Sequence, residues 1–559
     1  MIDPRFPELT LKQINSLKAF GTEEHFPTPT RVFSLGDTNY DFFVILKGCI
    51  SITDAGREGK EVVEHTVNQF SGDSGMLSTR RALFHATTGA DTTLLRIKPD
   101  RLKEAIAAHS DISDMLLNAF LLRDDTVLNE FEGGIKVVGR EDSTSTYKVR
   151  DFMEKNHIWY TFIDLDKSEE AEEMLAHFDL CSIEDLPILI DSDGRVAVNP
   201  SLDKVARYTG VLMDFEDKVF DVLVIGAGPA GLAASVYAAS EGLDVVTIDS
   251  SAPGGQAGKS SKIENYLGFP IGISGSDLAN KAYIQAQKFG CNISIPHKAE
   301  KMEYTGTHYL VTASNDKVIK SRTVVAATGA NYQQLPAKNL AKYEGIGVYY
   351  SATGMHAAQC KDSDIGVVGG GNSAGQAALF LADHARMVYV ILRGNDLSAK
   401  MSDYLVQRIE ACKNIEVLLH TNVTELKGNT HLETCILQTK DDHREVPISN
   451  LFTFIGAKPC SNWLNEGVET DQKGFISTGA GISPERIQAS PAFKEREPFN
   501  YETSSCGFFA VGDVRKGSVK RVASAVGEGS VVVSEIHRYL ALHRQTKQQT
   551  NSLQAEAKA

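Results

Sequence analysis

The spacing of hydrophobic and polar residues follows three different patterns along the chain. In residues 1 to about 125, short apolar runs such as FFVILKGCISITDA have a period close to two and are separated by glycines, which is typical of a small antiparallel β-roll or barrel. Apolar residues recur every three or four positions over residues 100–131, which predicts helix. From residue 133 onward, strand-like and helix-like runs alternate to about residue 545. This alternation predicts α/β domains.

Length and charge limit the classes of protein that fit this pattern. A chain of 559 residues is too long for one hydrophobic core and predicts three or four domains. The net charge of -15 argues against unspecific nucleic-acid binding, because phosphate contacts need a basic face. The N-terminus lacks the basic-then-apolar pattern of a signal peptide. The apolar stretch at residues 222–240 is broken by glycine and proline, so we expect a cytosolic protein without a membrane span.

The eight cysteines are widely spaced. The closest pair, Cys412 and Cys435, is 23 positions apart, so the chain contains no C-x-x-C and no metal-type cysteine cluster. We therefore expect no metal site and interpret most of the cysteines as reduced core residues.

The first glycine-rich turn follows a strand-like run and precedes a helix-like one. Its glycines are Gly226, Gly228 and Gly231, and Asp249 ends the next strand-like run. Gly226 permits a tight turn, Gly228 lets the backbone approach a pyrophosphate, and Gly231 allows close helix–strand packing. The helix N-terminus presents N–H groups to the anion. Together with Asp249, which suits a ribose 2′-hydroxyl, this arrangement predicts a dinucleotide site.

A second turn, GGGNSA, repeats this plan later in the chain. Its landmarks are Gly369, Gly371, Asn372, Ser373 and Ala374. Here the following strand-like run ends at an arginine instead of an acid. Because an arginine pairs with a 2′-phosphate, this pattern favours NADPH over NADH. The cations concerned are Arg393 and, nearby, Lys400; the alternative is that Arg393 is a solvated surface charge.

Seven ordered motifs in residues 218 to about 545 resemble the low-molecular-weight thioredoxin reductase family of flavoproteins. They are GAGPAG, PGGQ, IENYLGFP, AATGA, GGGNSA, FFAVGDVR and KRVASAVGEGS. The resemblance implies two Rossmann-type domains, FAD and NADPH as cofactors, and a homodimer. The FAD residues that it implies are Gly226, Gly228, Pro229, Ala230, Gly231, Asp249, Gly254, Gly255, Gln256, Asn265, Ala327, Thr328, Gly329, Gly512, Asp513, Arg521, Val522 and Ala523.

One motif of that family is missing. Its disulfide-reducing members carry C-A-T-C ahead of the second glycine turn, whereas this chain reads Ser351-Ala352-Thr353-Gly354. Neither serine nor glycine forms a disulfide, so an internal dithiol relay is excluded at this place. Cys360 is the only nearby thiol, and we interpret it, like Cys506, as structural in preference to redox-active. The family's arginine signature is also thinner, because only Arg393 of its three arginines remains.

The front of the chain resembles two further folds. Residues 1 to 125 resemble a cyclic-nucleotide-binding β-roll, in which Gly72 and Asp73 stand for the ribose-binding pair and Arg80 for the phosphate-binding arginine. The cassette is shortened and carries aspartate for glutamate, so we favour a ligand-free or altered-ligand roll over a cyclic-nucleotide site. No helix-turn-helix follows. Residues 133–215 resemble a thioredoxin or glutaredoxin fold, with Pro187 at its cis-proline and no cysteine in Ser143–Thr146, where the C-x-x-C would fall.

These observations predict a multidomain chain with a β-roll, a thioredoxin-like α/β domain and two three-layer Rossmann-type domains. The predicted boundaries are 1–130 for the roll with its helices, 131–216 for the thioredoxin-like domain, 217–335 with 463–545 for the FAD domain, 336–462 for the NAD(P)H domain and 546–559 for a frayed polar tail.

The function implied is an NAD(P)H-dependent FAD oxidoreductase without a dithiol. A hydride from NADPH is expected to reach the flavin after a domain rotation. Electrons then leave directly to an external acceptor such as ferredoxin, flavodoxin, a quinone or a disulfide, since the cofactor supplies the difficult chemistry. Regulation by the β-roll is a further expectation. The alternatives are a flavin- and NADPH-binding redox sensor without turnover, and a scaffold that keeps FAD for stability alone.

Overall fold

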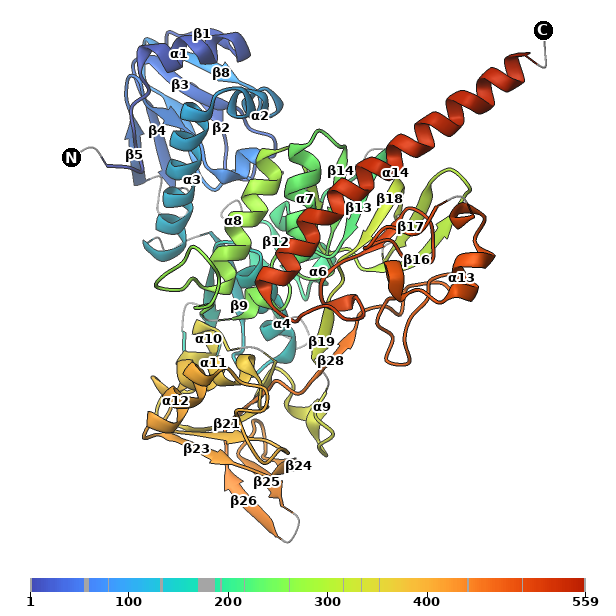
Figure 1. Cartoon of the computed structure of the whole chain (residues 1–559). Helices are drawn as coiled ribbons and strands as arrows, with labels where there is room; N and C mark the ends of the chain where they lie inside the picture. Colours follow the sequence, from blue (N-terminus) through green and yellow to red (C-terminus); the bar gives the residue numbers. More distant parts are fainter. Residues whose placement is uncertain are drawn as a thin grey trace. The chain divides into compact units, whose positions relative to one another are not determined.

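The computed structural model of the chain (Figure 1) describes residues 3–54, 60–78, 80–130, 134–168, 186–191, 194–215, 217–260, 262–314, 316–332, 334–350, 352–439, 442–494 and 496–556. The chain divides into two compact units. The first comprises Met1–Glu141, Val149–Phe215 and Tyr283–Pro296, and the second comprises Asp142–Lys148, Glu216–Ala282 and His297–Ala559.

The N-terminal part of the first unit consists of two four-stranded antiparallel sheets. One has the order β1 (Thr22–Phe26), β8 (Thr92–Ile97), β3 (Phe42–Lys47) and β6 (Phe70–Ser71), and the other β2 (Arg31–Phe33), β7 (His85–Thr88), β4 (Ile50–Asp54) and β5 (Lys60–His65). The helices of this part are α1 (Leu11–Leu17), α2 (Pro99–Ala108) and α3 (Ser110–Glu130). The predicted β-rich front part is therefore present, and its assignment to the cyclic-nucleotide-binding fold stays a prediction.

A mixed sheet follows these helices. Its order is β10 (Tyr160–Asp164), β9 (Ile135–Gly139), β11 (Ile188–Ile190) and β12 (Val196–Val198). Strand β9 runs parallel to β10 and antiparallel to β11. The neighbouring helices are α4 (Thr144–Lys155) and α6 (Leu202–Thr209). The peptide bond before Pro187 is cis, as predicted. Residues 169–185 of the predicted thioredoxin-like domain lie outside the described residues, and the thioredoxin-like assignment stays a prediction.

The first nucleotide-binding sheet lies in the second unit (Figure 1). Its central strand β13 (Val219–Ile225) runs parallel to both neighbours, and the order is β14 (Val245–Ile248), β13, β18 (Val318–Ala326), β17 (Tyr309–Ala313) and β16 (Ala299–Tyr304). The late strand β29 (Phe508–Ala510) runs parallel to β18. Helix α7 (Pro229–Ser240) follows β13, and the long helix α14 (Val522–Glu556) packs against it. Residues far apart in sequence thus build one nucleotide-binding layer.

The second nucleotide-binding sheet is parallel throughout. Its order is β20 (Val348–Tyr349), β27 (Asn450–Thr453), β21 (Asp364–Val368), β22 (Met387–Ile391) and β23 (Ile415–Leu418). An antiparallel sheet of β24 (Asn422–Lys427), β25 (Thr434–Gln438) and β26 (His443–Pro447) accompanies it. The helices of this part are α9 (Leu340–Tyr343), α10 (Gly354–Gln359), α11 (Asn372–Ala382) and α12 (Asp403–Ala411).

The remaining elements complete the two units. They are α8 (Gly275–Lys288), β15 (Asn292–Ser294), the antiparallel pair β19 (Ala330–Tyr332) and β28 (Ala457–Pro459), and α13 (Pro484–Ala489). The prediction of a frayed tail from residue 546 is wrong for most of that segment, because α14 continues to Glu556. A helix already nucleated by packing extends by one hydrogen bond per residue, so polar residues continue it at little cost. None of the helices in the described chain is long and apolar enough to cross a bilayer.

Candidate active site

The first glycine turn connects β13 to α7. Gly226 has φ +107°, a value that favours glycine, and its N–H donates to the carbonyl of Ile248 (2.7 Å). A Cβ on Gly231 would lie 1.7 Å from the carbonyl oxygen of Gly226. Pro229 occupies the first turn of α7, where its missing N–H costs nothing. Two of the three predicted glycines are therefore required for steric reasons by the fold itself.

Two further segments converge on this turn. The Gly254 N–H donates to the carbonyl of Ala227 (2.7 Å), and a Cβ on Gly255 would lie 3.2 Å from the Cα of Gly228. A Cβ on Gly512 would lie 2.9 Å from the Cβ of Ala230. The structure thus brings together the GAGPAG, PGGQ and FFAVGDVR motifs, which are separated by up to almost 300 residues in the sequence.

The space around these motifs fits the predicted dinucleotide. A Cβ on Gly329 or on Gly371 would meet no described atom within 4 Å, and on Gly228 the nearest atom would be 4.0 Å away. These backbones are therefore open at the positions where a pyrophosphate approaches, whereas Gly226 and Gly231 are closed by their own turn. Backbone N–H groups at a helix N-terminus with free space in front of them suit an anion.

Asp249 has a different environment from the one expected. Its carboxylate accepts hydrogen bonds from the N–H groups of Ala227 (2.8 Å), Ser251 (2.8 Å) and Ala252 (3.2 Å). Burial raises the pKa of Asp249, and these amide donors act in the opposite direction. The side chain therefore holds the turns at the ends of β13 and β14 together, and its contact with a ribose hydroxyl stays a prediction.

The predicted residues near the C-terminus depend on an acid that sequence reasoning missed. The Glu528 carboxylate accepts from the Gly512 N–H (2.7 Å) and pairs with Arg515 (2.6 Å). Lys520 donates from Nζ to the carbonyl of Asp513 (2.6 Å), and burial raises the pKa of the Asp513 carboxyl. Glu528 therefore fixes the turn that presents Asp513. The signal that could have revealed it is a single acid within the apolar stretch VASAVGEGS.

The other predicted FAD residues lie at the edges of this cluster. Thr328 donates from Oγ1 to the carbonyl of Cys460 (2.7 Å), and Gln256 donates from Nε2 to Oδ1 of Asn331 (3.4 Å). Asn265 is exposed in a loop. The remaining predicted positions form or precede the first turn of α14 and are Arg521, Val522 and Ala523.

The second glycine turn connects β21 to α11. The Gly369 N–H donates to the carbonyl of Ile391 (3.0 Å), and a Cβ there would lie 2.7 Å from the carbonyl oxygen of Phe454. Ala374 is buried, and Asn372 accepts through Oδ1 from the N–H of Ser402 (2.7 Å). The turn therefore repeats the first one, with Gly371 at the open N-terminus of α11.

The two cations predicted for the 2′-phosphate lie beyond the end of β22. Arg393 and Lys400 are both exposed. No salt bridge joins either of them to another residue of the described chain. Both charges are thus available to an anionic ligand, and their contact with NADPH stays a prediction.

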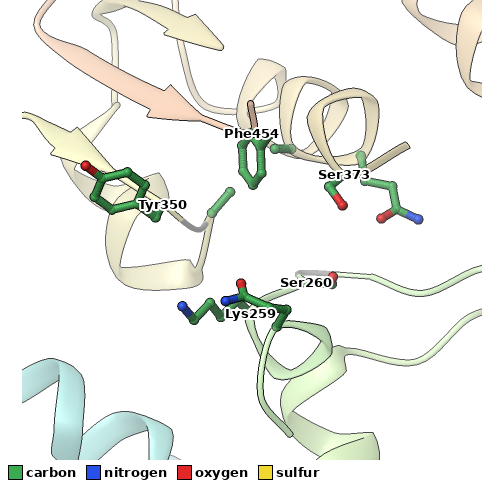
Figure 2. Close-up of a pocket in the computed structure, with 9 residues that line it drawn as sticks. Lys259, Ser260, Tyr350, Ser373 and Phe454 are labelled. Carbon is green, nitrogen blue, oxygen red and sulfur yellow. The ribbon is translucent and has the colours of Figure 1, made fainter. Parts of the chain in front are cut away.

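A small pocket lies between the segment that contains Gln256 and the N-terminal part of α11 (Figure 2). Its lining residues are Gln256, Lys259, Ser260, Tyr350, Ala352, Ser373, Gln376, Ala377 and Phe454. Figure 2 shows Lys259 and Ser260 on one side, facing Tyr350, Ser373 and Phe454 on the other. The stretch expected to carry the dithiol therefore reaches the space between the GGQ segment and α11.

The dithiol positions and the nearest thiols can be located only in part. Ser351 lies outside the described residues. Gly354 begins α10, and a Cβ there would meet no described atom within 4 Å. Cys360 is 0% exposed, and burial raises its pKa to about 12. Burial likewise raises the pKa of Cys506 to about 11, and Arg496 donates to its sulfur (3.2 Å). Neither thiol is activated as a nucleophile, because the thiolate is the reactive form.

The seven described cysteines are free thiols. Within the described ranges, no group of three or more His, Cys, Asp or Glu side chains is arranged to hold a metal ion.

The predicted nucleotide residues of the β-roll are engaged by protein groups. Asp73 accepts from the hydroxyl of Tyr40 (2.6 Å) and from the N–H of Gly75 (2.7 Å). Arg80 donates from Nη2 to the carbonyl of Asn156 (2.8 Å). Gly72 has φ +132°. The arginine expected to face a cyclic phosphate thus contacts the turn after α4, and ligand binding by this site stays a prediction.

Two sheets with parallel central strands, each with a glycine turn that opens a helix, are typical of dinucleotide-dependent oxidoreductases with two nucleotide sites. Residues 220–529 match the pyridine nucleotide-disulphide oxidoreductase family. This match covers more than half of the chain, which therefore belongs to that family.

The relatives narrow the family further. Thioredoxin reductase of Bacillus subtilis (strain 168) is 30% identical over 329 residues, which are 58% of this chain and 96% of the relative. The 34.2 kDa protein in the rubredoxin operon of Clostridium pasteurianum is 28% identical over 327 residues, 58% of this chain and 98% of the relative. The crystal structure of Lactococcus lactis thioredoxin reductase in the FR conformation matches with a TM-score of 0.51 and 25% identity, over 58% of this chain and 99% of that one.

The chain is thus an NAD(P)H-dependent flavoprotein oxidoreductase with a thioredoxin reductase-like two-Rossmann fold in its C-terminal part. The thioredoxin reductase family uses FAD and NADPH, and both glycine turns fit these cofactors.

Proposed function

We propose that this oxidoreductase passes electrons from FAD directly to an external acceptor, without an internal dithiol. One observation carries the proposal: both glycine turns are complete, while the relay stretch reads Ser351-Ala352-Thr353-Gly354. The nearest thiol, Cys360, is buried in the core of the second nucleotide-binding sheet and has a raised pKa. A lone buried thiol does not cycle as a dithiol.

Bound FAD would supply the redox chemistry, taking two electrons as a hydride from NADPH and releasing them singly to two ferredoxin or flavodoxin molecules or together to one quinone or disulfide. The chain's own residues bind and orient the two cofactors. The N-termini of α7 and α11 present backbone N–H groups to the pyrophosphates. Glu528 fixes the turn of Gly512 and Asp513, and Arg393 and Lys400 supply cations for a 2′-phosphate.

The proposed acceptors are a ferredoxin or flavodoxin first, and a quinone or an outside disulfide second. All of them take electrons without a dithiol in the reductase. Ferredoxin and flavodoxin are placed first because ferredoxin–NADP reductases of related architecture work without the dithiol. A homodimer is also proposed, by analogy with the family, and light scattering of the purified protein measures its mass directly.

Anaerobic mixing with NADPH tests the first half of the reaction. We expect rapid loss of the flavin absorbance near about 450 nm. A flavin that stays oxidised would refute turnover and support the alternative of a sensor that binds both cofactors without reaction.

A panel of acceptors, thioredoxin included, then tests the second half. We expect thioredoxin to be a poor acceptor for the wild type. The variant Ser351→Cys/Gly354→Cys restores the family's C-A-T-C and is the matched control, with Ser351→Cys alone as the single-thiol comparison. Reduction of thioredoxin by the wild type at the rate of the double variant would contradict the proposal.

The β-roll is proposed to regulate this activity. Its support is that Arg80 contacts the Asn156 carbonyl, so a phosphate that attracts Arg80 would release that contact. Calorimetry with cyclic AMP and cyclic GMP on the wild type and Arg80→Ala measures binding. Equal heats of binding for the wild type and Arg80→Ala would show that Arg80 does not contact the ligand.

A further inference from the structure

Two residues that closely follow the stretches without their expected dithiols lie in contact with each other. Ser143–Thr146 is the place of the thioredoxin-like C-x-x-C, and residues 351–354 are the place of the reductase relay. The Oη atom of Tyr147, the residue directly after the first stretch, lies 3.3 Å from Nε2 of His356, two residues beyond the end of the second. Asp142–Lys148 belongs to the same compact unit as both nucleotide-binding sheets. No local sequence pattern connects these positions, which are 209 residues apart.

The tautomer of His356 decides which atom donates in each of its hydrogen bonds. The backbone N–H of Thr353 lies 3.3 Å from Nδ1 of His356. Because a backbone N–H only donates, Nδ1 is the acceptor and carries no proton in the neutral ring. Nε2 therefore carries the proton and donates to Oη of Tyr147. The buried His356 thus connects Tyr147 to Thr353, the N-cap residue of α10.

Aromatic packing supports the same contact. The Tyr147 ring lies 5.9 Å from that of Tyr349 and 6.2 Å from that of His356, centroid to centroid. Tyr349 and His356 themselves lie 4.5 Å apart and pack with Phe452. Such separations are those of interacting aromatic pairs. Tyr147 therefore packs against the core of the second nucleotide-binding sheet.

Gly345 makes this approach possible. A Cβ at Gly345 would lie 3.0 Å from Cδ1 of the Tyr147 ring. The ring thus packs against Gly345 as well as against Tyr349 and His356. A side chain packed against several segments in this way restricts the movement of each of them.

Residues next to those that Tyr147 contacts line the pocket of Figure 2. Tyr147 acts on Tyr349 by packing and on Thr353 through His356. Between these two residues, Tyr350 and Ala352 line the pocket together with Ser373 at the N-terminus of α11. The contact therefore holds both ends of the short segment that forms one wall of the nucleotide pocket.

We propose that Tyr147 is a positioning residue for the NADPH pocket, which it orients through Tyr349 and His356. This inference rests on the proposed function, in which NADPH binds at the N-terminus of α11, where Ser373 lines the pocket. Tyr147 lies outside residues 220–529, the part that matches the reductase family. The thioredoxin-like stretch, which has no cysteine at Ser143–Thr146, thus positions part of the reductase through Tyr147 and does not carry electrons.

Calorimetry with NADP⁺ on the FAD-loaded protein is the first test. Tyr147→Phe removes the hydroxyl and keeps the ring, and a lost neutral hydrogen bond is expected to weaken binding by about two- to tenfold. Tyr147→Ala removes the ring as well and is expected to weaken binding further. Tyr160→Phe is the matched control, because it removes another tyrosine hydroxyl, which donates to Glu154 (2.8 Å) on α4. Unchanged affinity in Tyr147→Ala, or an equal loss in Tyr160→Phe, would overturn the proposal.

Hydrogen exchange of peptides covering residues 349–359 is the second test and needs no activity. We expect faster exchange there in both Tyr147 variants than in the wild type and Tyr160→Phe, with FAD content unchanged. Unchanged exchange would overturn the proposal even if affinity fell. A wild type that binds NADP⁺ but shows no flavin reduction by NADPH would refute the proposed function, and the binding and exchange comparisons would still decide the role of Tyr147.

Discussion

Gly231→Ala tests whether the first glycine turn, which is expected to bind a nucleotide, is close-packed. The added Cβ would lie 1.7 Å from the carbonyl oxygen of Gly226 and 3.2 Å from the Cβ of Ala327. Optimal non-bonded separations are about 3.5–4.0 Å, so α7 must move by roughly 2 Å relative to the end of β13. The obstacle is backbone, which does not rotate away as a side chain does. We therefore expect at least the usual cost of overpacking, about 1–3 kcal/mol.

The assay is the FAD content of the purified protein together with its thermal unfolding. A displaced α7 moves its N-terminal N–H groups away from the pyrophosphate, so we expect Gly231→Ala to be purified largely without FAD. A cost of about 3 kcal/mol corresponds to a fall in Tm of roughly 6–12 °C for a domain of this size.

Gly354→Ala is the matched control. Its Cβ would meet no described atom within 4 Å, and its φ lies outside the left-handed region. Because alanine meets no steric obstacle there and adopts this backbone conformation without strain, we expect this variant to keep its FAD and its Tm. Full FAD occupancy in Gly231→Ala, with a Tm within one or two degrees of wild type, would refute the close-packed turn.

Four further outcomes follow from the structure. Arg393→Ala removes an exposed cation from the predicted 2′-phosphate position, and steady-state kinetics should show a KM for NADPH raised by about two- to tenfold, with that for NADH unchanged. Thr146 is buried, and its Oγ1 has no partner within the described chain, so Thr146→Val should raise the free energy of unfolding by about 1 kcal/mol in a urea titration. Burial, followed by the nearby charge of Asp73, raises the pKa of Asp124 to about 7; the folded protein then holds an extra proton from about pH 4 to about pH 7, and its stability falls as pH rises through that range. Asp124→Asn should lack this fall when urea midpoints at pH 5 and pH 8 are compared. Ser351→Cys/Gly354→Cys should acquire NADPH-dependent reduction of thioredoxin, and a wild type equally active in that assay would show that no dithiol is needed.

Much of the nucleotide-binding part could be predicted because its signals are local. The strand, glycine turn and helix around Gly226 and Gly369 each occupy a short window, and steric demands on the backbone appear directly as residue identity. Charged residues that contact distant parts of the chain were harder to predict from the sequence. Glu528 stabilises the turn of Gly512, and only its isolated charge in an apolar run hinted at such a role. Asp249 was expected at a ribose but bonds to three backbone amides, because their N–H groups lie within reach only after β13 and β14 pair.

The sequence alone determined the two nucleotide turns, the cofactor class and the absence of cysteine at positions 351 and 354. These properties depend on residue type at fixed short spacing, so no tertiary information is needed to infer them. Only the tertiary structure decided that Tyr147 contacts His356 and that Tyr350 and Ala352 line the pocket. The physical reason is that packing and hydrogen bonds between distant segments depend on how the sheets bring them together, and no periodicity in the chain records that arrangement.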